Sequence, residues 1–326
     1  MKNLLIALKG MAMGMAETVP GVSGGTIAFI TGIYEKLLET IKAFKPSLLK
    51  TWKQDGVKAV WNEINGTFII SLLGGMIVGI GIGVVVIEKL IHLYPPVVWA
   101  FFFGLIIASI IYIGKQISKW DSKTIGALIL GGIIAFGITQ IPIGQVNESL
   151  WFVFLCGAIA VSALILPGIS GSFILLIMGM YSYILHDTLK TGLIENHESG
   201  ALITMIVFGL GMIVGLVTMA RFLTWSLKKH KNTTFAILTG FMIGALNKLW
   251  PWRVPEKVML ENDEIVNFNE LSSLEFDKVI TEYSTSPSGY TEKWGEPAFL
   301  VGVIVFFFIG LLLVLGMDYF SKNKSH

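Results

Sequence analysis

Residues 20–26 read Pro20-Gly21-Val22-Ser23-Gly24-Gly25-Thr26, and 147 residues later the chain reads Pro167-Gly168-Ile169-Ser170-Gly171-Ser172-Phe173. Each copy is flanked by apolar runs, and Gly32 after the first copy falls on Gly179 after the second. A proline with several glycines interrupts a helix, and interrupted backbone at membrane depth persists only where protein or a polar cavity satisfies it. Paired interruptions in corresponding places of two halves are typical of a transporter's binding site. We call residues 20–26 the first break and residues 167–173 the second break, and interpret them as the centre of the site.

The composition indicates a membrane protein. Of 326 residues, 54% are hydrophobic and 14% are charged, and the mean hydropathy is +0.73. Soluble domains are about half apolar and about a quarter charged, so the long apolar runs predict an all-α polytopic membrane protein. The net charge of +2 does not suggest a nucleic-acid partner, and the single Cys156 excludes a disulfide framework and a thiol metal site. We expect neither a metal nor a cofactor, and coupling to a proton or to sodium stays open.

The apolar runs divide the chain into two repeats with one plan, a helical hairpin around the break followed by three transmembrane helices. The first repeat, 1–141, has a hairpin at 4–44, a basic amphipathic inner segment at 45–65 and spans at 67–93, 96–117 and 124–141. The second repeat, 150–326, has a hairpin at 150–189, spans at 201–227, 233–250 and 297–320, and an acidic outer loop at 251–296. Hairpin legs of ~16–19 residues are short for a ~30 Å hydrocarbon core, so we expect re-entrant hairpins. We also expect 26–44 to continue as one helix.

A second set of matches supports the repeat. Gly75-Met76-Ile77-Val78-Gly79 is identical to Gly211-Met212-Ile213-Val214-Gly215 at an offset of 136. Gly104 and Gly240 fall in the next spans at the same offset. The ordered series of matches predicts that the two halves fold alike.

Three crossings per repeat invert the second repeat relative to the first, and the charges favour one orientation. With the N-terminus inside, most lysines fall in inner loops, and the 251–296 loop carries four basic residues against ten acidic ones. The inner lysines are Lys42, Lys45, Lys50, Lys53, Lys58, Lys115, Lys119, Lys123, Lys228, Lys229, Lys231, Lys322 and Lys324. Because positive charge marks cytoplasmic loops, we predict that both termini are cytoplasmic and that 45–65 lies on the inner membrane surface.

The breaks have the chemistry of an anion site. A helix N-terminus offers unpaired N–H groups and a partial positive charge, and Ser23 and Ser170 are good N-caps. The candidate substrate-binding residues are Glu17, Pro20, Gly21, Ser23, Gly24, Gly25, Thr26, Pro167, Gly168, Ser170, Gly171, Ser172 and Arg221. The alternative is that the prolines and glycines only kink helices for close packing.

Two charged candidates lie within apolar runs, where a charge is costly. Arg221 either binds the anion bidentately or extends its charge to the inner interface. Glu17 either pairs with Arg221 or takes up a proton that couples transport.

An enzyme is the less favoured class. Both breaks match the short G-x-S-G pattern of intramembrane serine proteases, but that chemistry also needs a histidine base close to the serine. The five histidines fall at predicted loops, span ends or the tail: His92, His186, His197, His230 and His326. Metal-ligand spacing and a Gly-Lys-Ser/Thr phosphate loop are absent from the sequence. We therefore predict a transporter with no catalytic residues.

The paired Pro-Gly-x-Ser-Gly motifs, with Glu17-Thr18-Val19 before the first, resemble the PopT family of polyprenyl-phosphate translocases, and the resemblance covers nearly the whole chain. It implies a bacterial cytoplasmic-membrane protein, surrounded by membrane lipids, that returns undecaprenyl phosphate from the outer to the inner leaflet for carrier-lipid recycling in cell-wall synthesis. Ser172 and Phe173 replace Gly25 and Thr26 in the second copy, which implies unequal binding at the two breaks. The alternatives are a carrier of a small water-soluble anion and an intramembrane lipid-phosphate enzyme. The pattern does not define an oligomeric state.

Overall fold

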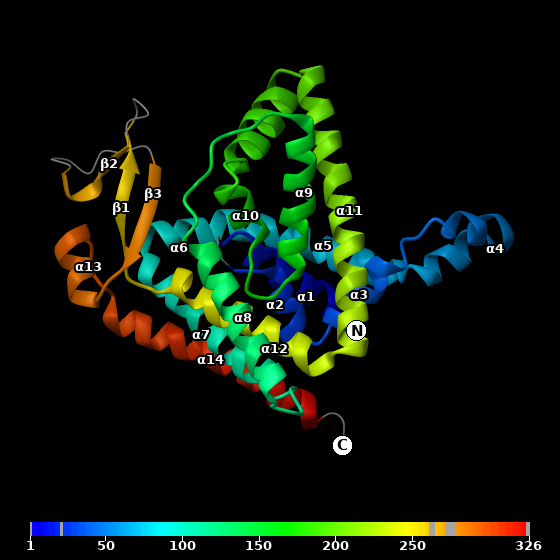
Figure 1. The fold of residues 1–326 in the computed structure, drawn as a ribbon, viewed down its shortest axis with the longest axis horizontal. Helices are drawn as coiled ribbons and strands as arrows, with labels where there is room; N and C mark the ends of the chain where they lie inside the picture. The colour runs from blue at the N-terminus through cyan, green and yellow to red at the C-terminus, as the bar shows by residue number, and fades with distance from the viewer. Residues whose placement is uncertain (1, 20–21, 261–264, 271–277, 324–326) are drawn as a thin grey trace.

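The computed structural model describes residues 2–19, 22–260, 265–270 and 278–323, and they are mostly helical (Figure 1). The first half contains α1 (Lys2–Glu17), α2 (Gly24–Ile30), α3 (Tyr34–Lys42), α4 (Leu48–Glu63), α5 (Gly66–Ile82), the π-helix η1 (Gly83–Ile87), α6 (Glu88–Leu93), α7 (Pro95–Gly114) and α8 (Ser122–Thr139). The second half contains α9 (Leu150–Ile165), α10 (Gly171–Ile177), the π-helix η2 (Tyr183–Glu195), α11 (Ser199–Lys229), α12 (Lys231–Ala245), the 3-10 helix η3 (Leu246–Leu249), α13 (Pro287–Trp294) and α14 (Leu300–Asn323). Three strands and a further 3-10 helix lie before α13: β1 (Arg253–Met259), β2 (Ile265–Asn267), η4 (Phe268–Glu270) and β3 (Lys278–Ser284).

The prediction of a helical membrane protein is confirmed. Four helical segments among the described residues are long and apolar enough to cross a membrane: Gly66–Leu93, Pro95–Gly114, Ser122–Thr139 and Ser199–Lys229. They correspond to the predicted spans 67–93, 96–117, 124–141 and 201–227. The predicted span 297–320 lies on α14. The predicted span 233–250 is shorter than expected, because α12 has 15 residues and continues only as the 3-10 turn η3.

Each hairpin has a straight first leg and a broken second leg. The first legs, α1 and α9, end at the breaks as expected. The prediction of one helix over 26–44 is wrong, because α2 ends at Ile30 and α3 begins only at Tyr34. Between them Gly32 has a φ of 72°, and its match Gly179, after α10, has a φ of 73°. A left-handed residue cannot continue a right-handed helix, so the matched glycines end both short helices at corresponding places.

The first helix of each half packs closely on the first span of the same half. A Cβ added to Gly75 of α5 would overlap the carbonyl oxygen of Ala7 in α1. The matching residue, Gly211 of α11, stands in the same way against Phe154 of α9, which is the match of Ala7 at the offset of 147. Small residues at helix interfaces let backbones approach closely in membranes, and here both halves use them at the same positions.

The remaining spans pack across the two halves. Gly104 of α7 lies against the backbone of Phe307 in α14, and its match Gly240 of α12 lies against Leu128 of α8. The second span of each half therefore packs on the third span of the other half. This exchange joins the two halves into one bundle.

The two predicted extramembrane segments lie at opposite ends of the longest axis of the molecule (Figure 1). At one end α4 projects with no buried residue and bends at Gly56, where φ is 77°. At the other end the described residues of 251–296 form a small antiparallel sheet of order β2-β1-β3 with α13 beside it (Figure 1). Val254 and Val258 of β1 are fully buried and pack with Trp252 in a separate apolar cluster. These strands were not expected from the sequence.

Candidate functional site

The first break is a capped helix start in the centre of the bundle. Ser23 is in an extended conformation before α2, and its Oγ accepts a hydrogen bond from the amide of Gly25 at 3.0 Å. This is the geometry of an N-cap, which satisfies one of the amides that a helix start leaves unpaired. Val19, just before the break, and Val22, within it, are fully buried in the main apolar cluster. The predicted capping role of Ser23 is thus present in the fold.

The second break repeats this arrangement with a different partner. Ser170 is extended before α10, and its Oγ accepts from the amide of Phe173 at 3.4 Å. The same oxygen lies 2.8 Å from the hydroxyl of Ser172, a residue for which the first break has Gly25. Ser170 is buried, like Ser23. Both predicted caps exist, but only the second has a neighbouring side-chain hydroxyl from the break itself.

The two breaks are in direct contact with each other. The amide of Gly168 donates to the hydroxyl of Thr26 at 3.1 Å. The Ser23 hydroxyl lies 3.0 Å from the carbonyl oxygen of Leu164 and 3.2 Å from that of Leu166, the two residues around the end of α9. Segments more than 140 residues apart in the sequence therefore meet through buried polar groups. A buried polar group costs free energy unless it is paired, so these contacts hold the breaks together.

Protein oxygens occupy several of the amides that were expected to face an anion. Glu17, at the end of α1, accepts a hydrogen bond from the amide of Gly24 through Oε1 at 2.5 Å. Gly25 is paired with Ser23, and Gly168 is paired with Thr26. The Glu17 carboxyl group thus occupies the start of α2 in this conformation, and its hydrogen bond is to α2 rather than to Arg221.

A cavity lies beside the second break. A small pocket of about 20 Å³ is lined by Gly168, Ser170 and Phe173. Thr139, Phe173 and Lys248 line both this pocket and a larger cavity of about 520 Å³. The larger cavity lies between the end of α8 and the segment after it, α10, and strands β1 and β3. The second break is therefore next to a roomy cavity that has charged side chains in its lining.

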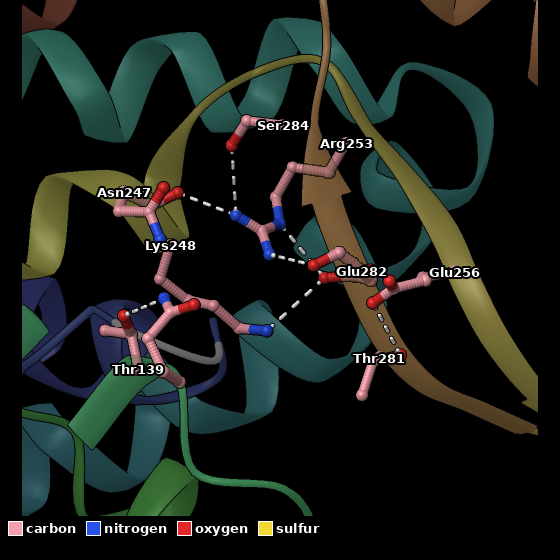
Figure 2. Close-up of polar contacts among 9 residues, drawn as sticks. Thr139, Asn247, Lys248, Arg253, Glu256, Thr281, Glu282 and Ser284 are labelled. Carbon is pink, nitrogen blue, oxygen red and sulfur yellow. Dashed lines mark hydrogen bonds and ion pairs between the residues drawn. The ribbon is translucent and has the colours of Figure 1, made fainter. Parts of the chain in front are cut away.

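Two cations line the larger cavity, and one carboxylate holds both (Figure 2). Lys248 Nζ lies 3.3 Å from Glu282 Oε2, and Arg253 Nε lies 3.1 Å from the same oxygen. Arg253 also donates to the carbonyl oxygens of Asn247 at 2.7 Å and Glu282 at 3.2 Å. The Lys248 ammonium lies 5.4 Å from the centre of the Phe173 ring in α10. Lys248 thus links the sheet of β1, β2 and β3 to the second break.

The charges around Glu282 decide its protonation. Burial would raise the pKa of this carboxyl, but the Lys248 and Arg253 charges and their hydrogen bonds outweigh burial and hold its pKa below the usual range. Glu282 is therefore ionised at neutral pH and neutralises one of the two cations.

The structure brings together most of the sequence-predicted residues but not all of them. Glu17, Ser23, Gly24, Gly25, Thr26, Pro167, Gly168, Ser170, Gly171 and Ser172 lie at or beside the two contacting breaks. Pro20 and Gly21 fall outside the described residues. Arg221 is on an exposed face of α11 and lines none of the cavities described above. This placement favours the interpretation that Arg221 reaches the interface.

Lys248 and Arg253 were missed at the sequence level. Lys248 lies near the outer end of the predicted span 233–250, where a lysine is unexpected under the positive-inside pattern. This exception to the positive-inside pattern was the signal that could have identified Lys248 as a candidate site residue. Arg253 is one of only four basic residues in an acidic loop, and composition alone does not show which of the four faces a cavity.

Comparisons with known proteins agree on one family. A family model described as VCA0040-like, undecaprenyl phosphate translocase-like, matches residues 13–266. A protein of Vibrio cholerae named polyprenyl-phosphate transporter is 38% identical over 323 residues, which cover 99% of this chain and 98% of the relative. A protein of Staphylococcus aureus with the same name is 30% identical over 256 residues, which cover 75% of this chain and 85% of the relative. No solved structure matches the chain.

Both named relatives are transporters, in agreement with the prediction of a transporter rather than an enzyme. The family match includes both breaks, and the match to the Vibrio cholerae protein extends over nearly the full length of both chains. This chain belongs to the VCA0040-like family, described as undecaprenyl phosphate translocase-like.

Proposed function

We propose that this protein is a membrane translocase that moves a polyprenyl phosphate, undecaprenyl phosphate in particular, from the outer to the inner leaflet of the bacterial cytoplasmic membrane, so that the carrier lipid is reused. The observation that carries the proposal is the contact between the two breaks, where the Gly168 amide meets the Thr26 hydroxyl at 3.1 Å beside a cavity. Membership of the family and the names of the two relatives support the substrate class.

The chain then consists of two inverted repeats, 1–141 and 150–326. Equivalent close contacts support this division, since Gly75 meets Ala7 in one half and Gly211 meets Phe154 in the other. An odd number of crossings per repeat inverts the second repeat. The elements that rock against each other in such transporters are the repeats or bundles around a central site.

The orientation we propose has both termini in the cytoplasm and the sheet of β1, β2 and β3 outside. The lysine-rich inner loops support it, because positive charge is retained on the cytoplasmic side. The basic segment α4 and the acidic outer segment lie at opposite ends of the longest axis (Figure 1), as this orientation requires.

The proposed chemistry of transport follows from the polar groups at the two breaks. Moving a charged head group through hydrocarbon costs several kcal/mol or more, so a path needs polar groups that replace water. When the breaks separate, the Thr26 and Ser23 hydroxyls and the Gly168 amide lose their protein partners. Each of them then binds a phosphate oxygen. Phosphate binding therefore compensates for the contacts that open, while the isoprenoid tail stays in lipid.

Reconstitution in liposomes tests this function. A fluorescent polyprenyl phosphate is added to both leaflets, and a membrane-impermeant quencher reports how fast the inner label reaches the outer leaflet. We expect rapid exchange with the protein, slow exchange in empty liposomes, and no effect on a fluorescent small water-soluble anion trapped inside. Exchange at the rate of empty liposomes, or release of the trapped anion instead, contradicts the proposal.

Arg221→Ala in the same liposomes tests the remaining candidate. A sharp loss of exchange places this arginine at the head group, and exchange near that of the unchanged protein removes it from the site.

A further inference from the structure

The cavity of about 520 Å³ at the outer sheet has a built-in cation pair that the breaks alone do not explain. Its lining includes Lys248 at the end of the bundle and Arg253 on β1 (Figure 2). It also includes two carboxylates, Glu282 and Glu256. Glu256 is exposed and accepts from the Thr281 hydroxyl at 3.2 Å, so its partner is a neutral group. Glu282 is the carboxylate that holds both cations.

Contacts other than those with the Glu282 carboxylate hold Lys248 and Arg253 in place, so the two cations stay close together if that carboxylate moves away. Arg253 Nη1 is held by the carbonyl oxygen of Asn247 at 2.7 Å, and Nη2 is held by the main-chain oxygen of Glu282 at 3.2 Å. These bonds do not involve the Glu282 carboxylate, and β1 pairs with β3 beside them, with Pro255 opposite Glu282. The Lys248 ammonium is held near the Phe173 ring as well as near Glu282. A second anion thus meets a guanidinium in a fixed position and an ammonium next to it.

One oxygen, Glu282 Oε2, receives both cations, so a single negative charge faces two positive charges. A phosphate monoester carries up to two negative charges near neutral pH and three acceptor oxygens. It therefore balances this cation pair better than the carboxylate does. Arg is suited to planar, bidentate contact with phosphate, and Lys to a point contact.

We propose that Lys248 and Arg253 form a phosphate-monoester receptor beside the second break, and that Glu282 is an internal substitute for the phosphate that leaves when the ligand binds. This proposal rests on the proposed function and deepens it. In the orientation argued above, the receptor faces the outer leaflet and loads the head group before it reaches Ser170, which lines the adjoining small pocket with Lys248.

A purely structural ion pair makes the opposite prediction for one variant. Either way Glu282→Gln loses an ion pair, but if Glu282 only fastens the sheet to the bundle, the variant does not strengthen ligand binding. If Glu282 occupies the receptor, the same variant binds phosphate more tightly, because the competing charge is gone.

The test is equilibrium binding to the full-length purified protein in detergent, followed by tryptophan fluorescence, since Trp250 lies two residues from Lys248. The ligands are undecaprenyl phosphate, undecaprenol with the same tail but no phosphate, and inorganic phosphate. The variants are Lys248→Gln, Lys248→Arg, Glu282→Gln and the control Lys257→Gln. Lys257 is an exposed lysine on β1 that does not line the cavity, so its variant loses the same charge from the same strand.

We expect Lys248→Gln to weaken undecaprenyl phosphate binding by about tenfold or more, as for a lost charge-assisted hydrogen bond. Lys248→Arg retains most of the affinity, and Lys257→Gln changes it little. Glu282→Gln tightens binding about two- to fivefold, the strength of a partly exposed ion pair that no longer competes. Undecaprenol binding stays the same in all of them, and inorganic phosphate shows the same order of variants if the receptor recognises the phosphate group alone.

Equal effects of Lys248→Gln and Lys257→Gln, or weaker binding by folded Glu282→Gln, overturn the proposal. The failure of the receptor is distinct from the failure of the proposed function. Leaflet exchange that persists while the Lys248 variants bind normally removes the receptor only. Phosphate binding that depends on Lys248 in a protein that exchanges no lipid removes the function only.

Discussion

At the scale of single residues, the serines that cap the two breaks make different sets of hydrogen bonds. Ser23 accepts from the Gly25 amide and also donates across the interface to a carbonyl oxygen of Leu164 or Leu166. Ser170 accepts from the Phe173 amide more weakly, at 3.4 Å, and pairs with Ser172 in its own break. Only Ser23 therefore joins a cap to the contact between the breaks.

The two serines should respond unequally to the same substitution. We expect Ser23→Ala to destabilise the protein by about 1–3 kcal/mol, because it loses a cap and leaves a buried polar partner unpaired. Ser170→Ala should cost about 1 kcal/mol, because it loses a weaker cap and a bond to the Ser172 hydroxyl, which is only partly buried. Thermal unfolding in detergent measures both, and a larger effect at Ser170 contradicts the assignment. Neither change should abolish transport completely, since neither serine is a nucleophile.

The ion pair of Glu282 has a defined dependence on pH. Because Lys248 and Arg253 hold its folded-state pKa below the unfolded value of about 4.3, its contribution is fully present above that value and is lost as the pH falls through the folded pKa. With a third of the side chain exposed, the contribution is about 1 kcal/mol or less. We expect Glu282→Gln to lower the unfolding temperature at pH 7, and we expect its difference from the unchanged protein to shrink as the pH falls below about 4.3. A difference that persists or grows in acid contradicts the linkage.

At the scale of helices, close contacts at glycines set which elements pair. Because Gly75 has no side chain, the backbone of α1 lies in contact with the backbone of α5. Gly211 allows the same contact between the backbones of α9 and α11. In lipid, apolar surfaces gain little from each other, so packing and close approach decide helix association. The same glycine positions in both halves therefore build the same helix pair twice.

A matched pair of substitutions tests this. Gly75→Ala should destabilise by about 1–3 kcal/mol, since the added Cβ overlaps the Ala7 backbone and overpacking outweighs the helix propensity of alanine. Gly74→Ala on the same helix has nothing within 4 Å of the added Cβ and should be neutral or stabilising by up to about 1 kcal/mol. Unfolding temperatures in detergent compare the two. Equal effects would show that the contact does not hold α1 and α5 together.

Particular residues show what the sequence can predict. The offsets of 147 and 136 located the breaks, their caps and the equivalent glycines, because backbone interruptions and small residues leave local signals. The packing of α7 on α14 and of α12 on α8 left no such signal in the sequence, because apolar helix faces have similar compositions. The end of α2 before Gly32 was signalled only by the match of Gly32 to Gly179. A single glycine in a sequence does not reveal whether its φ is positive. Lys248 and Arg253 became a pair only through the fold of 251–296, which distant contacts decide.

At the scale of the whole molecule, the placement of charge supports the proposed orientation. The basic helix α4 and the acidic sheet region occupy opposite ends of the longest axis (Figure 1). The breaks lie between them in the buried cluster, where Val19, Val22 and Ile165 pack together. Transporters built from two repeats place their substrate site near the middle of the bundle, where the repeats meet.

Labelling from each side of the membrane tests the orientation. In a protein whose only native cysteine, the buried Cys156, is replaced by alanine, Asp55→Cys and Leu260→Cys provide one accessible thiol each. A membrane-impermeant maleimide added to intact cells should label the thiol at 260 and leave the thiol at 55 unlabelled until the cells are opened. Labelling of both from one side contradicts the inverted arrangement.

The contact between the breaks is tested most directly by locking it. Ser23→Cys with Leu166→Cys introduces one thiol on each side of the contact, because the 3.2 Å approach of the Ser23 hydroxyl to the Leu166 main-chain carbonyl oxygen brings these two positions of the chain together. In liposomes with fluorescent polyprenyl phosphate, we predict that oxidation forms the disulfide and stops leaflet exchange, and that a reductant restores it to the rate before oxidation. Exchange that continues unchanged after the disulfide has formed would contradict breaks that meet and must separate for transport.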